Sequence, residues 1–364
     1  MTQREQQILE WIRQDPMISQ EDLAQRAGIT RSSVGVHISN LMKKGCILGK
    51  GYLLPDSGYV AVAGAVNVDI GGRSAGPLVG RDSNPGTVTV SMGGVGRNIA
   101  HNLRLLGVRV SLLTALGEDP HAGQVADSCE RLGIDLSRAL HVPGGTTSTY
   151  LFLSDEMGDM ALAVSDMGIY EALTPAYFAR HLGFLNGAAL VVADANLPQE
   201  ALDYLAHHCT APLLVDPVST VKAEKVRPIL GKLHTLKPNR LEAELLSGVA
   251  IRDLPSARQA AGKLLETGLQ RVFISLGTQG VFAADHTQDV WYPCCPAQMR
   301  SATGAGDAFA AALAWAFLEG KDLAYSARAA NAAAAIAVEG EKTINPALSA
   351  EAVQARMTEQ EEAL

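Results

Sequence analysis

The sequence predicts an α/β protein in which a mostly parallel sheet is flanked by helices and carries a small β lid, with a small helical domain in front of it. Short apolar runs such as YVAVAGAV, ALVVADA and PLLVDP alternate with helical stretches such as GRNIAHNLRLLG and SARQAAGKLLETG. Apolar strands separated by helices indicate a parallel sheet covered on both faces. At 364 residues, 47% of them hydrophobic, the chain can bury such a core and still carry an appended domain. We expect the two domains to span residues 1–55 and 56–364.

The N-terminal segment predicts three helices followed by a hairpin. REQQILEWIRQ places apolar residues at helical spacing, ISQEDLAQRAGI has Ser19 as N-cap and Gly28 as a stop, and RSSVGVHISNLMKKG follows Thr30. CILGKGYLLP, residues 46–55, then predicts a short hairpin. This is the order of elements in a winged helix-turn-helix.

Such a module places its third helix in the major groove of DNA. Its exposed polar residues would read the bases, with Lys43 and Lys44 near phosphates. The predicted base-reading residues are Arg31, Ser32, Ser33, His37 and Asn40. A homodimer is expected, because winged-helix proteins often read paired half-sites. A helical bundle that only dimerises or docks is the alternative.

Two segments, at about residues 69–94 and 146–168, break the alternation of strands and helices. Both alternate apolar and polar residues in the manner of strands and contain polar turns, with no helix between the strands. We expect them to form a small antiparallel sheet that folds over the active-site edge as a lid.

Composition excludes several classes of protein. The formal net charge of −8 argues against a surface that coats nucleic acid as a whole. The five cysteines are odd in number and lack CxxC spacing, which favours reduced, buried thiols and a cytoplasmic protein. The N-terminus is charged and no apolar run reaches the length of a bilayer, so we expect neither export nor a membrane.

The stretch SATGAGDAF places two glycines and a carboxylate at the start of an alanine-rich helix. Gly304 and Gly306 let backbone amides approach a ligand, and the positive end of the helix completes an anion site that suits a phosphoryl group. Asp307 would repel that phosphate, a cost that makes sense if it accepts the proton of an attacking hydroxyl. The alternative is an ordinary first-turn carboxylate beside a tight loop. The sequence lacks the GxxxxGK(S/T) of a P-loop, and GVGRNI fails the third glycine of a dinucleotide-binding loop.

TGAGDAF, together with SMGGVGRNIAHNLRLLG at residues 91–107, resembles the paired signatures of the PfkB, or ribokinase-like, sugar and nucleoside kinases. The resemblance extends over nearly all of residues 58–350 and implies a ribokinase-like fold. It implies that the aspartate of GAVNVDI, with an asparagine beside it, forms hydrogen bonds with sugar hydroxyls. It also implies that a diglycine forms the lid hinge and contacts the sugar, and that an amide side chain on the following helix binds the sugar as well. In this chain those residues would be Asp69, Asn67, Gly93, Gly94 and Asn98.

The same resemblance implies ATP as the phosphoryl donor and Mg²⁺ as its metal. LKPNRLEAE resembles the NxxE motif, in which Asn239 and Glu242 would organise Mg²⁺ and its waters, and ISLGTQG resembles the nucleotide loop. The residues implied at the nucleotide are Asn239, Ser275, Gly277, Gly280, Thr303 and Asn331. Asp307 would be the catalytic base, and the amides around Gly304, Ala305 and Gly306 would form the anion hole.

One residue departs from the family pattern. The family often reads DTTGAGD, whereas Ser301 stands here in place of the first aspartate. Because that aspartate helps to bind a monovalent cation, potassium activation stays open.

The acceptor is predicted less directly. INPALS, the serine at position 301 and the fused N-terminal module resemble the pseudouridine kinases within the family, which implies phosphorylation of a nucleoside 5'-hydroxyl by ATP. Thr147 and Thr149, with Thr146, lie in the second lid segment and would meet the base. Inosine, uridine, ribose and fructose remain alternatives, because a furanose pocket tolerates several substituents unless it hydrogen-bonds the base. A transcription regulator that senses such a ligand without turnover is a further alternative, although the GAGD and NxxE residues are intact.

Overall fold

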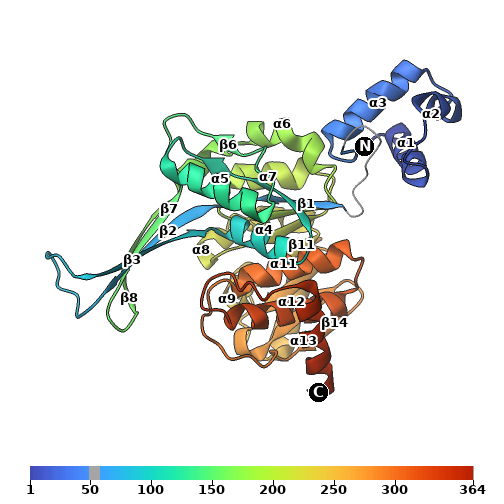
Figure 1. The fold of residues 1–364 in the computed structure, drawn as a ribbon. Helices are drawn as coiled ribbons and strands as arrows, with labels where there is room; N and C mark the ends of the chain where they lie inside the picture. The colour runs from blue at the N-terminus through green and yellow to red at the C-terminus, as the bar shows by residue number, and fades with distance from the viewer. Residues whose placement is uncertain (49–57, 364) are drawn as a thin grey trace.

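The computed structural model describes residues 1–48 and 58–363, and its centre is an eight-stranded sheet (Figure 1). The strand order is β14-β13-β12-β11-β10-β9-β1-β4. From β12 to β4 the neighbours are parallel, and β13 and β14 are antiparallel at one edge. The strands are β1 (Tyr59–Ala63), β4 (Arg109–Leu113), β9 (Leu190–Asp194), β10 (Leu213–Asp216), β11 (Thr235–Leu236), β12 (Arg271–Ser275), β13 (Val281–Asp285) and β14 (Asp289–Tyr292).

Helices cover both faces of this sheet, as the apolar runs predict. In β1, Val60 and Val62 belong to one hydrophobic cluster, while Ala61 and Ala63 belong to the other, because successive side chains point to opposite faces. The first face carries α4 (Val95–Leu105), α5 (Pro120–Leu132), α11 (Ala305–Leu318), α12 (Leu323–Val338) and α13 (Ala350–Ala363). The second face carries α6 (Pro175–Leu185), α7 (Gln199–His208), α8 (Thr220–Ala223), α9 (Arg240–Ser247) and α10 (Leu254–Leu265).

Short elements connect these layers. The parallel pair β5 (Ala115–Leu116) and β6 (Leu140–His141) lies beside the main sheet. The 3₁₀ helices are η1 (Gly168–Ala172), η2 (Arg227–Lys232) and η3 (Gly277–Gln279). Local sequence explains the helix ends: the Asp119 side chain caps α5 at the Ala122 N–H, and Gly133 ends the helix in the left-handed conformation.

The two lid segments form a four-stranded sheet that projects from the body (Figure 1). Its strands, in spatial order, are β3 (Gly86–Gly93), β2 (Asn67–Ser74), β7 (Thr149–Ser154) and β8 (Met160–Asp166). The prediction of a wholly antiparallel lid is wrong, because β2 and β7 pair in parallel. Both strands run outward from the body, and their antiparallel partners β3 and β8 return to it.

The N-terminal helices match the predicted order. They are α1 (Gln3–Gln14), α2 (Gln20–Ala27) and α3 (Arg31–Lys43). Ser19 caps α2, Thr30 caps α3, and Gly28 ends α2 in the left-handed conformation, as predicted. Ile8, Leu23 and other apolar residues of all three helices form a separate small core. The predicted hairpin at 46–55 lies largely outside the described residues.

Two composition-based expectations are refined by the structure. The cysteines are free, as expected, but Cys129 and Cys295 are buried whereas Cys294 is exposed and the other two are half-buried. The prediction of buried thiols is therefore wrong for Cys294. Within the described part of the chain, no helix combines the length and apolar character needed to cross a membrane.

Candidate active site

The GAGD stretch forms the N-terminus of α11. Gly304 is the N-cap residue with φ +87°, and a Cβ at this position would collide with the carbonyl oxygen of Thr343. Because no side chain caps this helix, its first-turn N–H groups remain directed at whatever lies beyond the helix end. An uncapped helix start of this kind can hold an anion, and the backbone here accepts only glycine at position 304.

Asp307 lies in the first turn of α11, half-buried beside this helix start. The Asn98 Nδ2 donates to its Oδ2 at 2.9 Å, which joins α4 to α11. Burial, with the carboxylate of Asp216 as the next cause, raises the pKa of Asp307 to about 7. A carboxyl group with a pKa near neutrality can exchange a proton with a bound hydroxyl at physiological pH.

Lys237 and Asp216 form a buried ion pair next to this helix start, and sequence reasoning missed both residues. The Lys237 Nζ lies 2.7 Å from Asp216 Oδ2, with both side chains less than a tenth exposed. A Cβ on Gly306 would lie 3.2 Å from the same Nζ, so the ammonium group is next to the first turn of α11. Burial disfavours its charge, but the carboxylates of Asp216, Glu242 and Asp307 together outweigh burial and raise the pKa of Lys237. The sequence signal that could have found them is a charged residue at the carboxyl end of each of two apolar runs: Asp216 is the last residue of β10, and Lys237 directly follows β11.

Asp69 lies at the base of the lid on β2. Burial raises the pKa of its carboxyl group to about 6, while the positive charge of Arg97 opposes this shift. A Cβ on Gly93 would collide with this carboxylate, so the glycine leaves the space that Asp69 occupies. The Asn67 side chain links the two lid segments, because its Oδ1 accepts from the Ser148 hydroxyl at 2.7 Å.

Gly94 and Asn98 connect the lid to the body. Gly94 caps α4 with φ +94°, at the point where β3 ends and the helix begins. Asn98 is 5% exposed, and its Oδ1 has no hydrogen-bond partner among the described residues. A buried amide oxygen without a partner is costly unless a ligand supplies a donor. Asn98 can therefore face a hydroxyl group on one side while it holds Asp307 on the other.

Asn239 and Glu242 form a reciprocal capping box at the start of α9. The Glu242 Oε2 accepts from the Asn239 N–H at 2.9 Å, and the Asn239 Oδ1 accepts from the Glu242 N–H at 3.0 Å. Glu242 is 2% exposed, and burial raises its pKa. An oxygen-only donor pair with a buried carboxylate suits Mg²⁺, which keeps most of its waters and needs few protein ligands. Among the described residues, no cluster of three or more His, Cys, Asp or Glu side chains could hold a metal alone.

A cavity of about 460 Å³ brings several of the predicted nucleotide residues together. Asn239, Ser275 and Gly277 line it, together with residues of η3. Gly280, with φ +89°, closes the η3 turn against the backbone of Tyr292. Asn331 lies apart from this lining and donates from Nδ2 to the Pro293 carbonyl at 2.6 Å, while Thr303 is exposed just before α11.

The threonines predicted to meet the base are placed differently from one another. Thr147 is 1% exposed, and its hydroxyl donates to Asp119 Oδ1 at 2.8 Å and accepts from the Gly117 N–H at 3.0 Å. Thr149 pairs with Val68 in the lid, so its side chain is on the face opposite to Asp69. In this structure neither side chain points toward Asp69 with a free hydroxyl.

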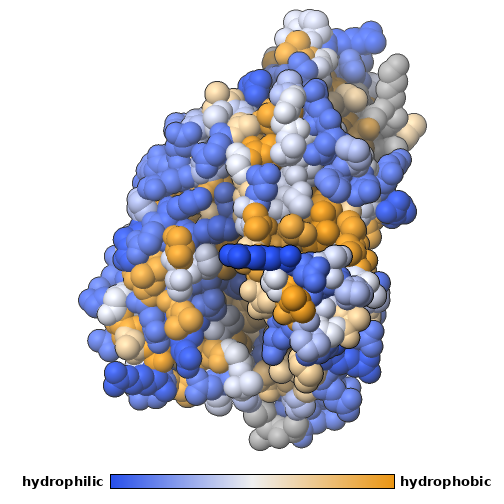
Figure 2. Space-filling model, turned by 90° about the vertical axis from the view of Figure 1, so that its left-hand side faces the viewer, coloured by the Kyte–Doolittle hydropathy of each residue, from blue (hydrophilic) through white to orange (hydrophobic). Residues whose placement is uncertain are grey.

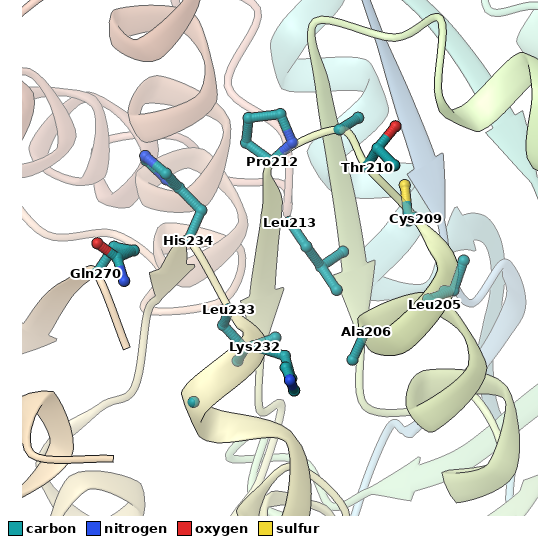
Figure 3. A pocket seen from close by; sticks show the side chains of 12 residues that line it. Leu205, Ala206, Cys209, Thr210, Pro212, Leu213, Lys232, Leu233, His234 and Gln270 are labelled. Carbon is teal, nitrogen blue, oxygen red and sulfur yellow. The ribbon is translucent and has the colours of Figure 1, made fainter. Parts of the chain in front are cut away.

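A separate cavity of about 240 Å³ lies at the opposite, amino-terminal edge of the sheet (Figure 3). It is lined by Pro212 and Leu213 at the start of β10, by His234 before β11 and by Gln270 before β12. No predicted site residue lines it. Ligand sites of open α/β sheets lie at the carboxyl ends of the strands, where Asp216, Lys237 and Ser275 lie, so we assign no function to this cavity.

The third helix presents most of the predicted DNA-reading residues on an accessible surface. Arg31, Ser32 and Lys43 are exposed, and Ser33, His37 and Asn40 are half-buried. The hydroxyls of Ser32 and Ser33 each lie 2.9 Å from that of Thr30 at the helix start. Lys44, which was expected near phosphates, has its Nζ 2.6 Å from the buried Glu5 carboxylate, and this ion pair ties α3 to α1.

Family models match both parts of the chain. A model described as pfkB family carbohydrate kinase matches residues 57–350, and one described as winged helix-turn-helix DNA-binding matches residues 1–47. This chain therefore belongs to the pfkB family of carbohydrate kinases, and it is a phosphotransferase with an alcohol group as acceptor.

Individual relatives agree with this assignment. The uncharacterized sugar kinase YeiI of Escherichia coli (strain K12) is 38% identical over 96% of this chain and 98% of its own. The pseudouridine kinase of the same organism is 41% identical over 80% of this chain and 94% of its own. The crystal structure of a putative sugar kinase from Clostridium perfringens superposes with a TM-score of 0.77 at 31% identity, covering 84% of this chain and 97% of that one. The ribokinase-like fold predicted from the sequence is thus confirmed.

Proposed function

We propose that this protein transfers the γ-phosphoryl group of ATP to the 5'-hydroxyl of a nucleoside, most specifically pseudouridine. The observation that carries the proposal is Asp307, a carboxyl group with a pKa raised to about 7 that lies in the first turn of an uncapped helix. The likeness to a pseudouridine kinase over 94% of that enzyme's length supports the choice of acceptor.

The acceptor would lie between the lid and the start of α11. Asp69 and Asn98 would hold its ring hydroxyls by paired hydrogen bonds, since the Asn98 Oδ1 is buried without a partner in the described chain. Asp307 would then accept the proton of the 5'-hydroxyl, and the resulting oxygen would attack the γ-phosphorus as the bond to ADP breaks. The proton is then on the Asp307 carboxyl group, which releases it to solvent after the products, the 5'-phosphate and ADP, have formed.

The phosphoryl group would be stabilised from two sides during transfer. The N–H groups around Gly304, Ala305 and Gly306 present the positive end of α11. Lys237 adds a full charge beside Gly306, held in place by Asp216. The nucleotide would occupy the cavity lined by Asn239, Ser275 and Gly277, with Gly280, Thr303 and Asn331 at its margins. Mg²⁺, held through its waters at Glu242 and Asn239, would neutralise charge on the phosphates.

We further propose that residues 1–55 form a DNA-binding domain and residues 56–364 the kinase domain of a cytoplasmic homodimer. Support comes from the helix-turn-helix formed by α2 and α3 and from the exposure of Arg31 and Lys43. Salt-dependent DNA binding would separate this proposal from a module that only dimerises.

ADP release tests the kinase proposal. Purified protein with Mg-ATP is offered pseudouridine, uridine, inosine, ribose and fructose in turn, with Asp307→Asn as the blank. Turnover that is highest with pseudouridine supports the proposal. Highest turnover with another acceptor contradicts the choice of substrate, and no turnover with any of them favours a ligand-sensing regulator.

A further inference from the structure

The lid sheet has two chemically different faces. Asp69 of β2 pairs with Tyr150 of β7, and Gly71 pairs with Phe152, so these residues share one face of the sheet. The alternate residues of β7, Leu151 and Leu153, are on the other face and are exposed. Figure 2, which views the molecule from the lid end, shows hydrophobic residues gathered in a band across the middle of this side.

The two aromatic rings lie side by side on the Asp69 face. The Tyr150 and Phe152 ring centroids are 5.7 Å apart and the rings are inclined by 33°. A Cβ on Gly71 would collide with the Phe152 ring, so the glycine lets this ring lie directly over β2. The Tyr150 hydroxyl donates to the Met160 sulfur at 3.5 Å.

Neither ring is part of a buried core in the described chain. Both are half-buried, and neither belongs to the hydrophobic clusters formed by the described residues. Large aromatic side chains contribute stability mainly when they are buried in a core. On this face Tyr150 is paired with Asp69 at the end of the lid nearer the body. Toward the lid tip, beyond Gly71, the next residue of β2 on the same face is Arg73, whose Nη2 donates to the Glu156 carbonyl at 2.7 Å.

We propose that Tyr150 and Phe152 form a stacking platform for the flat heteroaromatic base of a nucleoside whose ribose is held by Asp69. This inference rests on the proposed function and adds what distinguishes a nucleoside from a free sugar. A free pentose reaches Asp69 but has no ring system to place on the platform. Stacking needs no donor or acceptor from Thr147 or Thr149, whose hydroxyls are engaged or directed to the other face.

The test replaces both rings by leucine, Tyr150→Leu with Phe152→Leu, which keeps apolar surface but removes the flat faces. Leu151→Ala is the matched control, because Leu151 lies between the two rings in sequence and is exposed on the opposite face. The kcat/KM values for pseudouridine and for ribose are measured with Mg-ATP, and pseudouridine binding is measured by calorimetry. Stacking on an aromatic ring is worth about 1–3 kcal/mol per base, so the nucleoside-to-ribose ratio of kcat/KM should fall by about tenfold or more in the double variant, through KM.

Three results would overturn the inference: an unchanged ratio in the double variant, an equal fall in the Leu151→Ala control, or a wild-type protein that prefers ribose to the nucleoside. The proposed function fails separately, if the wild type turns over no acceptor. In that event calorimetry still decides, because a platform predicts that nucleoside binding weakens by the same factor when the rings are removed.

Discussion

The pH dependence of the reaction rate should follow the ionisation of Asp307 near pH 7. A general base works only when deprotonated, and its pKa is raised to about 7 by burial and by the neighbouring Asp216. The ionised fraction of such a group rises about tenfold between pH 6 and pH 8. The kcat/KM for the acceptor should therefore rise about tenfold over this range and level off above it.

Asp307→Asn tests whether this carboxyl group is the base. The amide keeps the shape of the side chain but cannot accept the proton, and positioned acid–base groups contribute about 10²–10⁴-fold to rate. We expect kcat to fall by that factor, the ATP dissociation constant to stay within about threefold, and the acid limb of the pH profile to disappear. The assay is coupled ADP release from pH 5.5 to 9, with ATP binding measured by calorimetry.

The Asp216→Asn variant tests the same assignment independently, because it should move the acid limb of the pH profile. Removing the negative charge of Asp216 lowers the pKa of Asp307 and leaves Lys237 free to attract it, so the acid limb should move to lower pH. An acid limb that stays at the same pH in Asp307→Asn, or one that moves to higher pH in Asp216→Asn, would refute the assignment of the base.

Four further predictions follow from the site. Gly304→Ala should reduce kcat by more than about 100-fold and lower the thermal midpoint, because φ +87° is strained for alanine and its Cβ meets Thr343. Glu242→Gln, which retains an acceptor for the cap, should raise the Mg²⁺ concentration needed for half-maximal ATP binding by about tenfold, measured by calorimetry; unchanged Mg²⁺ dependence would exclude its role. Because burial raises the pKa of Asp307 above its unfolded value of 3.8, ionisation disfavours the fold increasingly from pH 4 to 7. Asp307→Asn should thus raise the free energy of unfolding, by at most about 4 kcal/mol, and more at pH 8 than at pH 5 in chemical denaturation. Arg31→Ala, which removes a predicted base contact, should weaken DNA binding by about 1–3 kcal/mol, whereas Arg13→Ala, the same charge change on α1, should weaken it less; equal effects would place the DNA elsewhere than α3.

Local patterns explain why much of the fold was predictable. The strands β1, β9 and β10 are continuous apolar runs buried on both faces, and such runs are typical of central parallel strands. Helix ends at Ser19, Gly28 and Thr30 follow from capping chemistry that involves only neighbouring residues. The GAGD helix start was recognisable for the same reason.

Features that depend on distant pairing were not predictable. The ion pair of Lys237 with Asp216 exists because β10 and β11 are adjacent, which brings together residues that are 21 positions apart. Lys44 was predicted to lie near phosphates, but a buried partner on α1 engages it. Thr147 is engaged by Asp119, 28 positions away. The parallel pairing of β2 with β7 likewise depends on how two segments leave the body, which local alternation does not encode.

The central claim is that the acceptor is a nucleoside and that pseudouridine is preferred. A competition experiment tests it most directly, because the ratio of products from a mixture equals the ratio of kcat/KM values at equal acceptor concentrations. Equimolar pseudouridine, uridine, inosine, ribose and fructose are mixed with limiting Mg-ATP, and the products are identified by mass spectrometry and phosphorus NMR. The account predicts that pseudouridine 5'-phosphate is the main product. A sugar phosphate as the main product would contradict it.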